Sequence, residues 1–128
     1  MELRELTGTI IGSAYTVHGG LGIGFVEPVY QRALAFELED AGLDVRREVR
    51  LEMQFRGRVV GEYVADLVVE GQVIIETKAV SVLLPAHEAQ LVNYLTATGI
   101  EDGLLLNFGS PRLQVRRKYR TYRPKEGS

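Results

Sequence analysis

The chain has 128 residues and a nearly balanced charge, with 15 basic and 17 acidic side chains and a formal net charge of −2. This length fits one domain, residues 1–128, that buries about two thirds of its unfolded surface. The absence of cysteine excludes disulfides, thiolate catalysis and cysteine zinc sites. We expect a soluble, cytoplasmic protein, because no segment is apolar enough to span a membrane and the N-terminus lacks a secretory signal.

The first helix is predicted over residues 6–18, where apolar side chains recur at helical spacing and Thr7 is a candidate N-cap. Four glycines within residues 19–24 then predict a tight turn. A phosphate-binding loop is the second interpretation, because the run lacks the Lys-Ser/Thr ending of a Walker motif.

A second helix is predicted over residues 26–41, with apolar side chains along one face and Gly42 as its C-cap. Pro28 is compatible with the first turn, where its missing donor has no intrahelical partner. Glu27 therefore lies at the positive, N-terminal end of this helix.

Five later segments are predicted as strands from their alternating or β-branched composition. They cover residues 49–55, 59–69, 73–80, 103–108 and 113–119. A third helix is predicted over residues 86–98, begun by Pro85 and ended by Gly99. The second and third strands are apolar on both faces, so we expect them in the centre of the sheet. The order is α-α-β-β-β-α-β-β, an α/β sandwich with a mixed sheet.

Positive charge is concentrated near the C-terminus. From residue 112 onward the chain carries seven basic residues and one acid, namely Arg112, Arg116, Arg117, Lys118, Arg120, Arg123, Lys125 and Glu126. Such a strip is usually a solvated edge that discourages aggregation, and contact with a nucleic-acid backbone is the alternative. From about residue 120 we expect a basic, flexible tail.

Charged residues interrupt the two central strands. Asp66 lies within the second strand, and Glu76 and Lys78 lie within the third. Side chains two apart share a sheet face, so Glu76 and Lys78 point the same way and Thr77 points to the other face. If the two strands form a hairpin, Asp66 lies near Glu76. Buried carboxylates need ionic partners or a metal, because an unpaired one costs several kcal/mol.

This arrangement suits phosphodiester hydrolysis. Asp66 and Glu76 supply hard oxygen ligands for Mg²⁺ or Mn²⁺, and the backbone carbonyl of Thr77 is a further candidate ligand. Such a cation lowers the pKa of bound water, while Lys78 orients that water or stabilises the transition state. A buried salt bridge of Lys78 with either acid, without catalytic role, is equally compatible with the spacing alone.

Three motifs carry a resemblance to a known superfamily. Asp66 followed by Glu76-Thr77-Lys78 resembles the D…(D/E)xK signature of the PD-(D/E)xK nucleases. Residues 24–30, GFVEPVY, match GxxExxY, the motif of a bacterial family of small proteins in that superfamily. Residues 90–94, QLVNY, resemble the QxxxY helix element of RecB-like and lambda-exonuclease-like members. The resemblance spans about residues 6–117.

The resemblance implies a restriction-endonuclease-like core, with a central mixed β-sheet flanked by helices. It implies a metal-dependent nuclease whose catalytic residues are Asp66, Glu76, Lys78 and Glu27. Its metal ligands would be Asp66, Glu76, Thr77 and Glu27, the last directly or through water, with Mg²⁺ or Mn²⁺ as cofactor. Its substrate-binding residues would be Gln90, Tyr94, His87 and Tyr30, with DNA as the expected nucleic acid. Thr77 stands where aliphatic residues are usual, but because its side chain is expected to face away from the site, we expect a change of packing and no loss of chemistry.

Plainer interpretations remain open for the accessory residues. Glu27 also fits as an acid that only interacts with the helix dipole, and Gln90 and Tyr94 also fit an ordinary half-buried helix face. His18 and His87 are expected as hydrogen-bonded structural histidines more often than ligands. The alternative to an enzyme is a non-catalytic nucleic-acid-binding or accessory subunit of a complex. Neither a homo-oligomer nor a protein partner is marked by any one segment.

Overall fold

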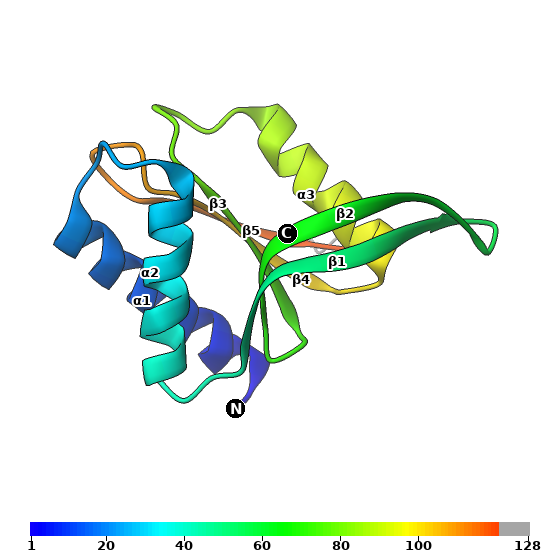
Figure 1. The fold of residues 1–128 in the computed structure, drawn as a ribbon, viewed down its shortest axis with the longest axis horizontal. Coiled ribbons are helices and arrows are strands. Elements are labelled where there is room, and N and C mark those ends of the chain that lie inside the picture. The colour runs from blue at the N-terminus through cyan, green and yellow to red at the C-terminus, as the bar shows by residue number, and fades with distance from the viewer. Residues whose placement is uncertain (121–128) are drawn as a thin grey trace, which may run out of the picture.

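The computed structural model describes residues 1–120, which fold into helices on both faces of one β-sheet (Figure 1). The elements are α1 (Leu3–Leu21), α2 (Glu27–Asp40), β1 (Val45–Phe55), β2 (Arg58–Val69), β3 (Val73–Lys78), α3 (Pro85–Thr98), β4 (Asp102–Asn107) and β5 (Gln114–Tyr119). This order confirms the one predicted from the sequence. The predicted tail, with Arg123, Lys125 and Glu126, lies outside the described residues.

The sheet has the strand order β1-β2-β3-β4-β5. The β3–β4 pair is parallel, and the other three pairs are antiparallel. A parallel pair needs a crossover connection, which α3 supplies between β3 and β4. The inner positions of β2 and β3 confirm the expectation from their apolar sequences, and β5 forms the partly exposed edge.

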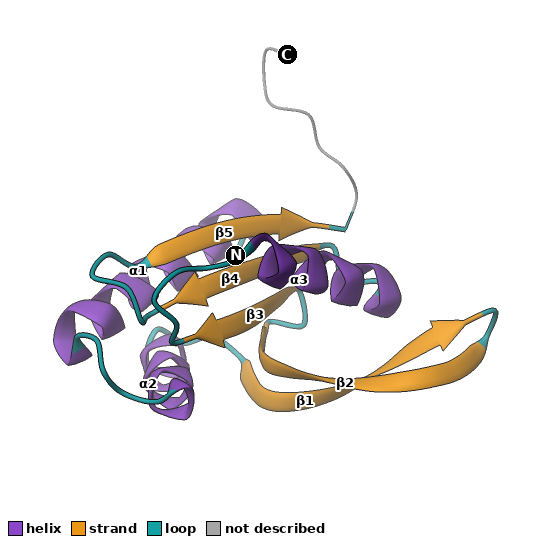
Figure 2. Ribbon diagram, turned by 90° about the horizontal axis from the view of Figure 1, so that it is seen from above, coloured by secondary structure: helices purple, strands orange, loops and turns teal. Residues whose placement is uncertain are grey.

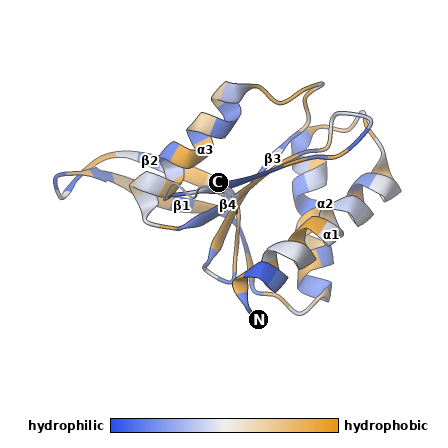
Figure 3. Ribbon diagram, turned by 180° about the vertical axis from the view of Figure 1, so that it is seen from behind, coloured by the Kyte–Doolittle hydropathy of each residue, from blue (hydrophilic) through white to orange (hydrophobic). Residues whose placement is uncertain are grey.

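The helices form two layers around the sheet (Figure 2), and each layer has its own apolar core. The α1/α2 core joins α1 and α2 to one sheet face and includes Leu6, Ile10, Ala14, Leu34, Leu38, Leu67, Ile75 and Leu106. The α3 core joins α3 to the opposite face and includes Tyr63, Ala65, Val68, Ile74, Leu91, Leu95 and Leu105. Burying one such large apolar side chain contributes about 1.5–3 kcal/mol. Figure 3 shows that hydrophobic and hydrophilic residues alternate along both the helices and the strands.

The start and end of α1 differ from the prediction. Thr7 was expected as the N-cap, and this is wrong: the Glu2 side chain accepts a hydrogen bond from the amide of Arg4 at 3.1 Å, and Thr7 is buried inside the helix. The helix also continues through the first two glycines of the run and ends at Leu21. The turn therefore begins only at Gly22, whose φ of 71° favours glycine.

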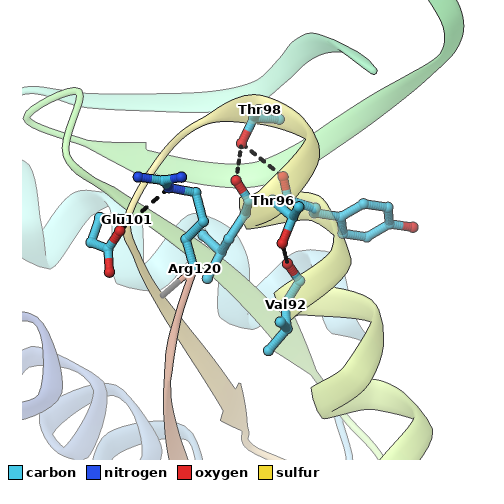
Figure 4. Close-up of polar contacts among 7 residues, drawn as sticks. Val92, Thr96, Thr98, Glu101 and Arg120 are labelled. Carbon is cyan, nitrogen blue, oxygen red and sulfur yellow. Dashed lines mark hydrogen bonds and ion pairs between the residues drawn. The ribbon is translucent and has the colours of Figure 1, made fainter. Parts of the chain in front are cut away.

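Polar contacts cluster where α3 ends beside the sheet (Figure 4). The hydroxyl of Thr98 donates to the carbonyl of Tyr94 at 2.8 Å, and Gly99 ends the helix with a left-handed conformation. Beside it, Arg120 forms an ion pair of 3.3 Å with Glu101. The helix that carries the predicted QxxxY residues is held on the sheet by Leu91 and Leu95 of the α3 core.

None of the helices within residues 1–120 is long and apolar enough to cross a membrane.

Candidate active site

The central strand β3 carries two of the predicted site residues at its carboxyl end. Alternation places Glu76 and Lys78 on the same face as Ile74, which belongs to the α3 core, and Thr77 on the other face. The β2–β3 pairing ends at Leu67↔Ile75. Asp66 is the next residue of β2 and lies beside the charged end of β3.

Asp66 lies where β2 changes its packing face. Leu67 packs in the α1/α2 core, whereas Ala65, two residues earlier, packs in the α3 core. The neighbouring strand is irregular at the same level, because Glu48 has a φ of 52° and the pairing passes from Arg47↔Leu67 to Val49↔Ala65. A positive φ at a non-glycine residue is uncommon in a strand. Beyond this point the β1–β2 hairpin curves away from the other strands (Figure 2) and packs against α3, and Asp66 is half-buried.

The carboxylate of Asp66 is held by the residue between Glu76 and Lys78. Its Oδ2 accepts a hydrogen bond from the amide of Thr77 at 2.8 Å and another from the Thr77 hydroxyl at 3.0 Å. The expectation that the Thr77 side chain faces away from the site is therefore wrong. Because both bonds use one oxygen, the other oxygen of Asp66 is left for a further contact.

Glu76 is partly buried, with its Oε1 fully enclosed, and this loss of solvent disfavours the charged carboxylate. Its Oε1 has no hydrogen-bond partner among residues 1–120. Burial raises the pKa of Glu76 to about 7; the backbone of Asp66 and the ammonium of Lys78 oppose this rise, and the charge of Glu27 adds to it. A buried polar atom without a partner is costly and rare, so it marks a place where an added group would be stabilised.

Glu27 is brought into the same electrostatic environment from α2. It is the first residue of that helix, as predicted, and burial together with the charge of Asp66 raises its pKa, while Lys78 lowers it. Three carboxyl groups from three elements thus act on one another around one ammonium. The structure brings together the four residues predicted as the catalytic set.

Tyr94 reaches this environment from α3. Burial and then the charge of Glu76 raise its pKa. Its ring stacks on Tyr63 of β2, with centroids 3.5 Å apart and planes 13° apart. Tyr63 is buried, and sequence reasoning missed it, because an aromatic residue in an apolar strand is most simply interpreted as core. Its position three residues before Asp66 is the only signal in the sequence.

The other predicted substrate-binding residues have different outcomes. Tyr30 is fully buried; its hydroxyl donates to the carbonyl of Gly22 at 2.6 Å, so its predicted contact with substrate is corrected to a role in holding the loop. His87 Nδ1 accepts from the amide of Leu84 at 3.1 Å and caps α3, which confirms a structural histidine. Gln90 is exposed and available.

His18 is also structural, as expected. Its Nε2 lies 2.9 Å from the carbonyl oxygen of Ser110, and its ring lies against Phe108. This contact ties α1 to the loop after β4 and leaves His18 outside the acidic centre.

The basic strip is partly used within the fold. Lys118 forms an ion pair of 3.2 Å with Glu88, and Arg117 donates to the hydroxyl of Thr7 at 3.3 Å. Arg112 and Arg116 are exposed. These contacts favour the interpretation of β5 as a solvated edge strand.

A metal ion at this centre would need ligands besides acidic side chains. Within the described part of the chain, no three His, Cys, Asp or Glu residues form a group that could hold a metal ion. The contact of Glu27 with a metal, directly or through water, stays a prediction. The donor set that remains is Asp66, Glu76 and backbone oxygen, and the partnerless oxygen of Glu76 fits a cation.

Comparison with known proteins identifies the family. The model of the PD-(D/E)XK nuclease superfamily matches residues 4–118, nearly the whole chain. The chain belongs to the PD-(D/E)XK nuclease superfamily. The five-stranded mixed sheet between helices is consistent with the restriction-endonuclease-like fold of this superfamily.

A solved structure titled "Crystal structure of SSO0001" supports this fold assignment for the PD-(D/E)XK chain. It aligns with a TM-score of 0.59 at 22% identity, over 72% of this chain. The chain spans about half of that protein, 48% of its length. No curated protein matches the chain.

Proposed function

We propose that the chain is a Mg²⁺- or Mn²⁺-dependent nuclease that cleaves DNA at the centre formed by Asp66, Glu76 and Lys78. The observation that carries the proposal is the buried Oε1 of Glu76, which lacks a partner within the described residues although charged groups surround it. A cation held there would offset the cost of ionising this carboxyl group. A purely structural salt bridge would be expected to satisfy that oxygen.

Asp66 and Glu76 would hold the cation, together with the backbone carbonyl of Thr77. The cation supplies Lewis-acid stabilisation of the phosphate and acidifies a water molecule. The hydrogen bonds from Thr77 fix the Asp66 carboxylate, so little reorganisation is needed on binding. Glu27, at the edge of this set, would act through its charge or through a bound water.

Lys78 would stabilise the negative charge that develops during the reaction. Its ammonium already lowers the pKa of both Glu27 and Glu76, so it lies close enough to stabilise negative charge at the centre. In the reaction it would hold the attacking water or the developing charge on the phosphate. Tyr94 and Gln90 on α3 would contact the scissile phosphate.

The motifs also support a finer assignment. We place the chain in the GxxExxY family and expect an exonuclease-like or RecB-like site, because Glu27 in α2 and Tyr94 in α3 border the same centre. Both positions come from the motifs of residues 24–30 and 90–94.

The test is a cleavage assay on linear, nicked and single-stranded DNA with Mg²⁺ or Mn²⁺. Lys78→Ala should abolish cleavage. Lys118→Ala should preserve it, because Lys118 lies on the edge strand β5 and forms its ion pair with Glu88 of α3. Cleavage that survives Lys78→Ala would refute the assignment. Calorimetric titration with Mn²⁺ provides a second test: binding should disappear in the double variant Asp66→Ala, Glu76→Ala.

The second candidate is a non-catalytic nuclease-fold subunit that binds nucleic acid or a protein partner. The net charge of −2 favours the form that works with a protein partner, since nucleic-acid-binding domains usually carry a positive excess. It predicts Mn²⁺ or DNA binding without cleavage of any substrate. A homo-oligomer or a complex would then complete the binding surface, which size-exclusion chromatography with and without DNA would detect.

A further inference from the structure

Two loops border the proposed active site, and neither carries a charged residue. The first, residues 22–26, leads directly into Glu27. The second, residues 79–84, follows Lys78 and leads into α3. Figure 1 shows both at the same end of the sheet, beyond the carboxyl end of β3.

Both loops display large apolar side chains to solvent. These five residues, which we call the apolar rim, are Ile23, Phe25, Val26, Val82 and Leu84, with exposed fractions of 54%, 48%, 67%, 53% and 52%. Single exposed apolar residues are common on proteins, but a set that borders a charged centre indicates a binding surface.

The first loop of the rim is held in a defined conformation. The hydroxyl of buried Tyr30 donates to the carbonyl of Gly22 at 2.6 Å and accepts from the amide of Phe25 at 3.2 Å. The ring of Phe25 packs edge-on against Tyr30, with centroids 6.2 Å apart. Phe25 is thus exposed but fixed, which lowers the entropic cost of stacking a ligand on it.

The second loop is anchored in the same way. The amide of Leu83 donates to Oε1 of Gln114 at 3.0 Å, and the Leu83 side chain is buried. Its neighbours Val82 and Leu84 point to solvent instead. Hydrogen bonds therefore hold both loops of the apolar rim in defined conformations.

The charge distribution decides which form of nucleic acid fits this surface. A duplex presents phosphates on its outside and is bound mainly by Lys and Arg. The two loops of the rim offer no cation, and the centre itself contains three carboxyl groups around one ammonium. An unpaired strand instead presents the apolar faces of its bases, which stack on aromatic and apolar side chains.

We propose that the apolar rim binds unpaired nucleobases, so that the substrate of this site is a single strand or an unpaired end. This inference rests on the proposed nuclease function. The rim would hold bases on both sides of the scissile phosphate, while the acidic centre, once loaded with a divalent cation, receives the phosphate itself.

The variants Phe25→Ser and Val26→Ser remove two rim side chains. Val26 is the N-cap residue of α2, and serine is a better N-cap than valine, so this second variant should not weaken the helix. Phe36→Ser is the matched control, because Phe36 is 63% exposed on the same helix but nine residues beyond Glu27. Thermal melting of each variant checks the fold.

The experiment measures cleavage of one labelled oligonucleotide as a single strand and as a duplex. The protein should cleave the single strand at least about tenfold faster, and each rim variant should raise KM for it by about tenfold, the size expected for one lost stacking contact. Phe36→Ser should leave KM unchanged.

Two outcomes would overturn the inference, and they are distinguishable. Equal cleavage of duplex and single strand, or an unchanged KM in both rim variants, would refute the rim while Lys78-dependent cleavage keeps the nuclease function. The absence of any Lys78-dependent cleavage of either substrate would refute the nuclease function and the inference with it.

Discussion

Two buried polar groups lie close together at the carboxyl end of the sheet, and their surroundings differ. Asn107 of β4 pairs with Lys78 of β3 across the parallel ladder, two residues beyond Glu76. The side chain of Asn107 is fully buried and makes four hydrogen bonds. It donates to Val80 O at 2.8 Å and to Gln114 Oε1 at 2.9 Å, and it accepts from Val80 N and Gly109 N, both at 3.0 Å.

Glu76 has the opposite environment. Its Oε1 has no partner in the part of the chain that the structure describes, and burial raises its pKa to about 7. A satisfied polar group such as Asn107 stabilises one conformation of the loop after β3. An unsatisfied acid costs stability and is retained where binding or chemistry compensates for it. The contrast between the two residues separates the structural from the functional part of this sheet end.

The largest expected effect is loss of activity in Glu76→Gln. The amide keeps the shape of the side chain but removes the charge that would bind a divalent cation, so cleavage should fall by at least about a hundredfold. The free energy of unfolding at pH 8 should not fall, because the variant no longer buries a carboxylate. Cleavage assays and urea unfolding measure the two effects. If Glu76→Gln lost stability but kept activity, Glu76 would have the structural role that is assigned to Asn107.

Asn107→Leu should have the opposite result. It leaves the amide and carbonyl of Val80 and the amide of Gly109 without their partner, and each buried unsatisfied group costs about 1–3 kcal/mol. We therefore expect a loss of about 3 kcal/mol or more in the free energy of unfolding, measured in urea. Asn93→Leu, at an exposed position of α3, is the control and should change it little. An equally small effect of Asn107→Leu would show that the network is dispensable.

Stability should also depend on pH through Glu76. Its pKa in the folded protein is about 7, above its ordinary value of 4.5, so the folded state binds the extra proton between these values. The free energy of unfolding therefore decreases as the pH rises from about 4.5 to 7, by at most about 3 kcal/mol, and then levels off. Urea unfolding at pH 5 and pH 8 measures this change.

The pH effect has two controls. Glu76→Gln should remove most of the decrease, and Mn²⁺ should restore stability at pH 8, because the cation binds the ionised carboxyl group. A decrease of the same size in Glu76→Gln would assign the effect to another acid, of which Glu27 is the first candidate because its pKa is also raised.

The sequence predicted the central acids because charge stands out in an apolar strand. Asp66, Glu76 and Lys78 interrupt segments that are otherwise mostly apolar, and alternation placed Glu76 and Lys78 on one face. The element order followed from periodicity in the same way. The bend at Asp66 had no such signal. It depends on a positive φ at Glu48, and glutamate is not a residue type that indicates a positive φ.

Other parts of the site were hidden for a related reason. The Tyr63–Tyr94 stack joins β2 to α3, and local patterns do not report which aromatic residues meet across a fold. The hydroxyl of Thr77 reaches Asp66 although alternation assigns it to the other face, because Asp66 lies at the bend where β2 changes face. Long-range geometry, rather than residue type, decides these contacts.

The smallest expected effect tests that unforeseen contact. Thr77→Val keeps the volume of a fully buried side chain and the amide bond to Asp66, but it removes the hydroxyl bond of 3.0 Å. The free energy of unfolding should fall by about 1 kcal/mol, and cleavage and Mn²⁺ affinity should fall several-fold, because Asp66 gains freedom. Thr98→Val removes a comparable hydroxyl bond at the far end of α3 and should lower stability alone. If Thr77→Val binds Mn²⁺ as tightly as the unaltered protein, the hydroxyl only fills space, and Asp66 is oriented by the backbone amide of residue 77.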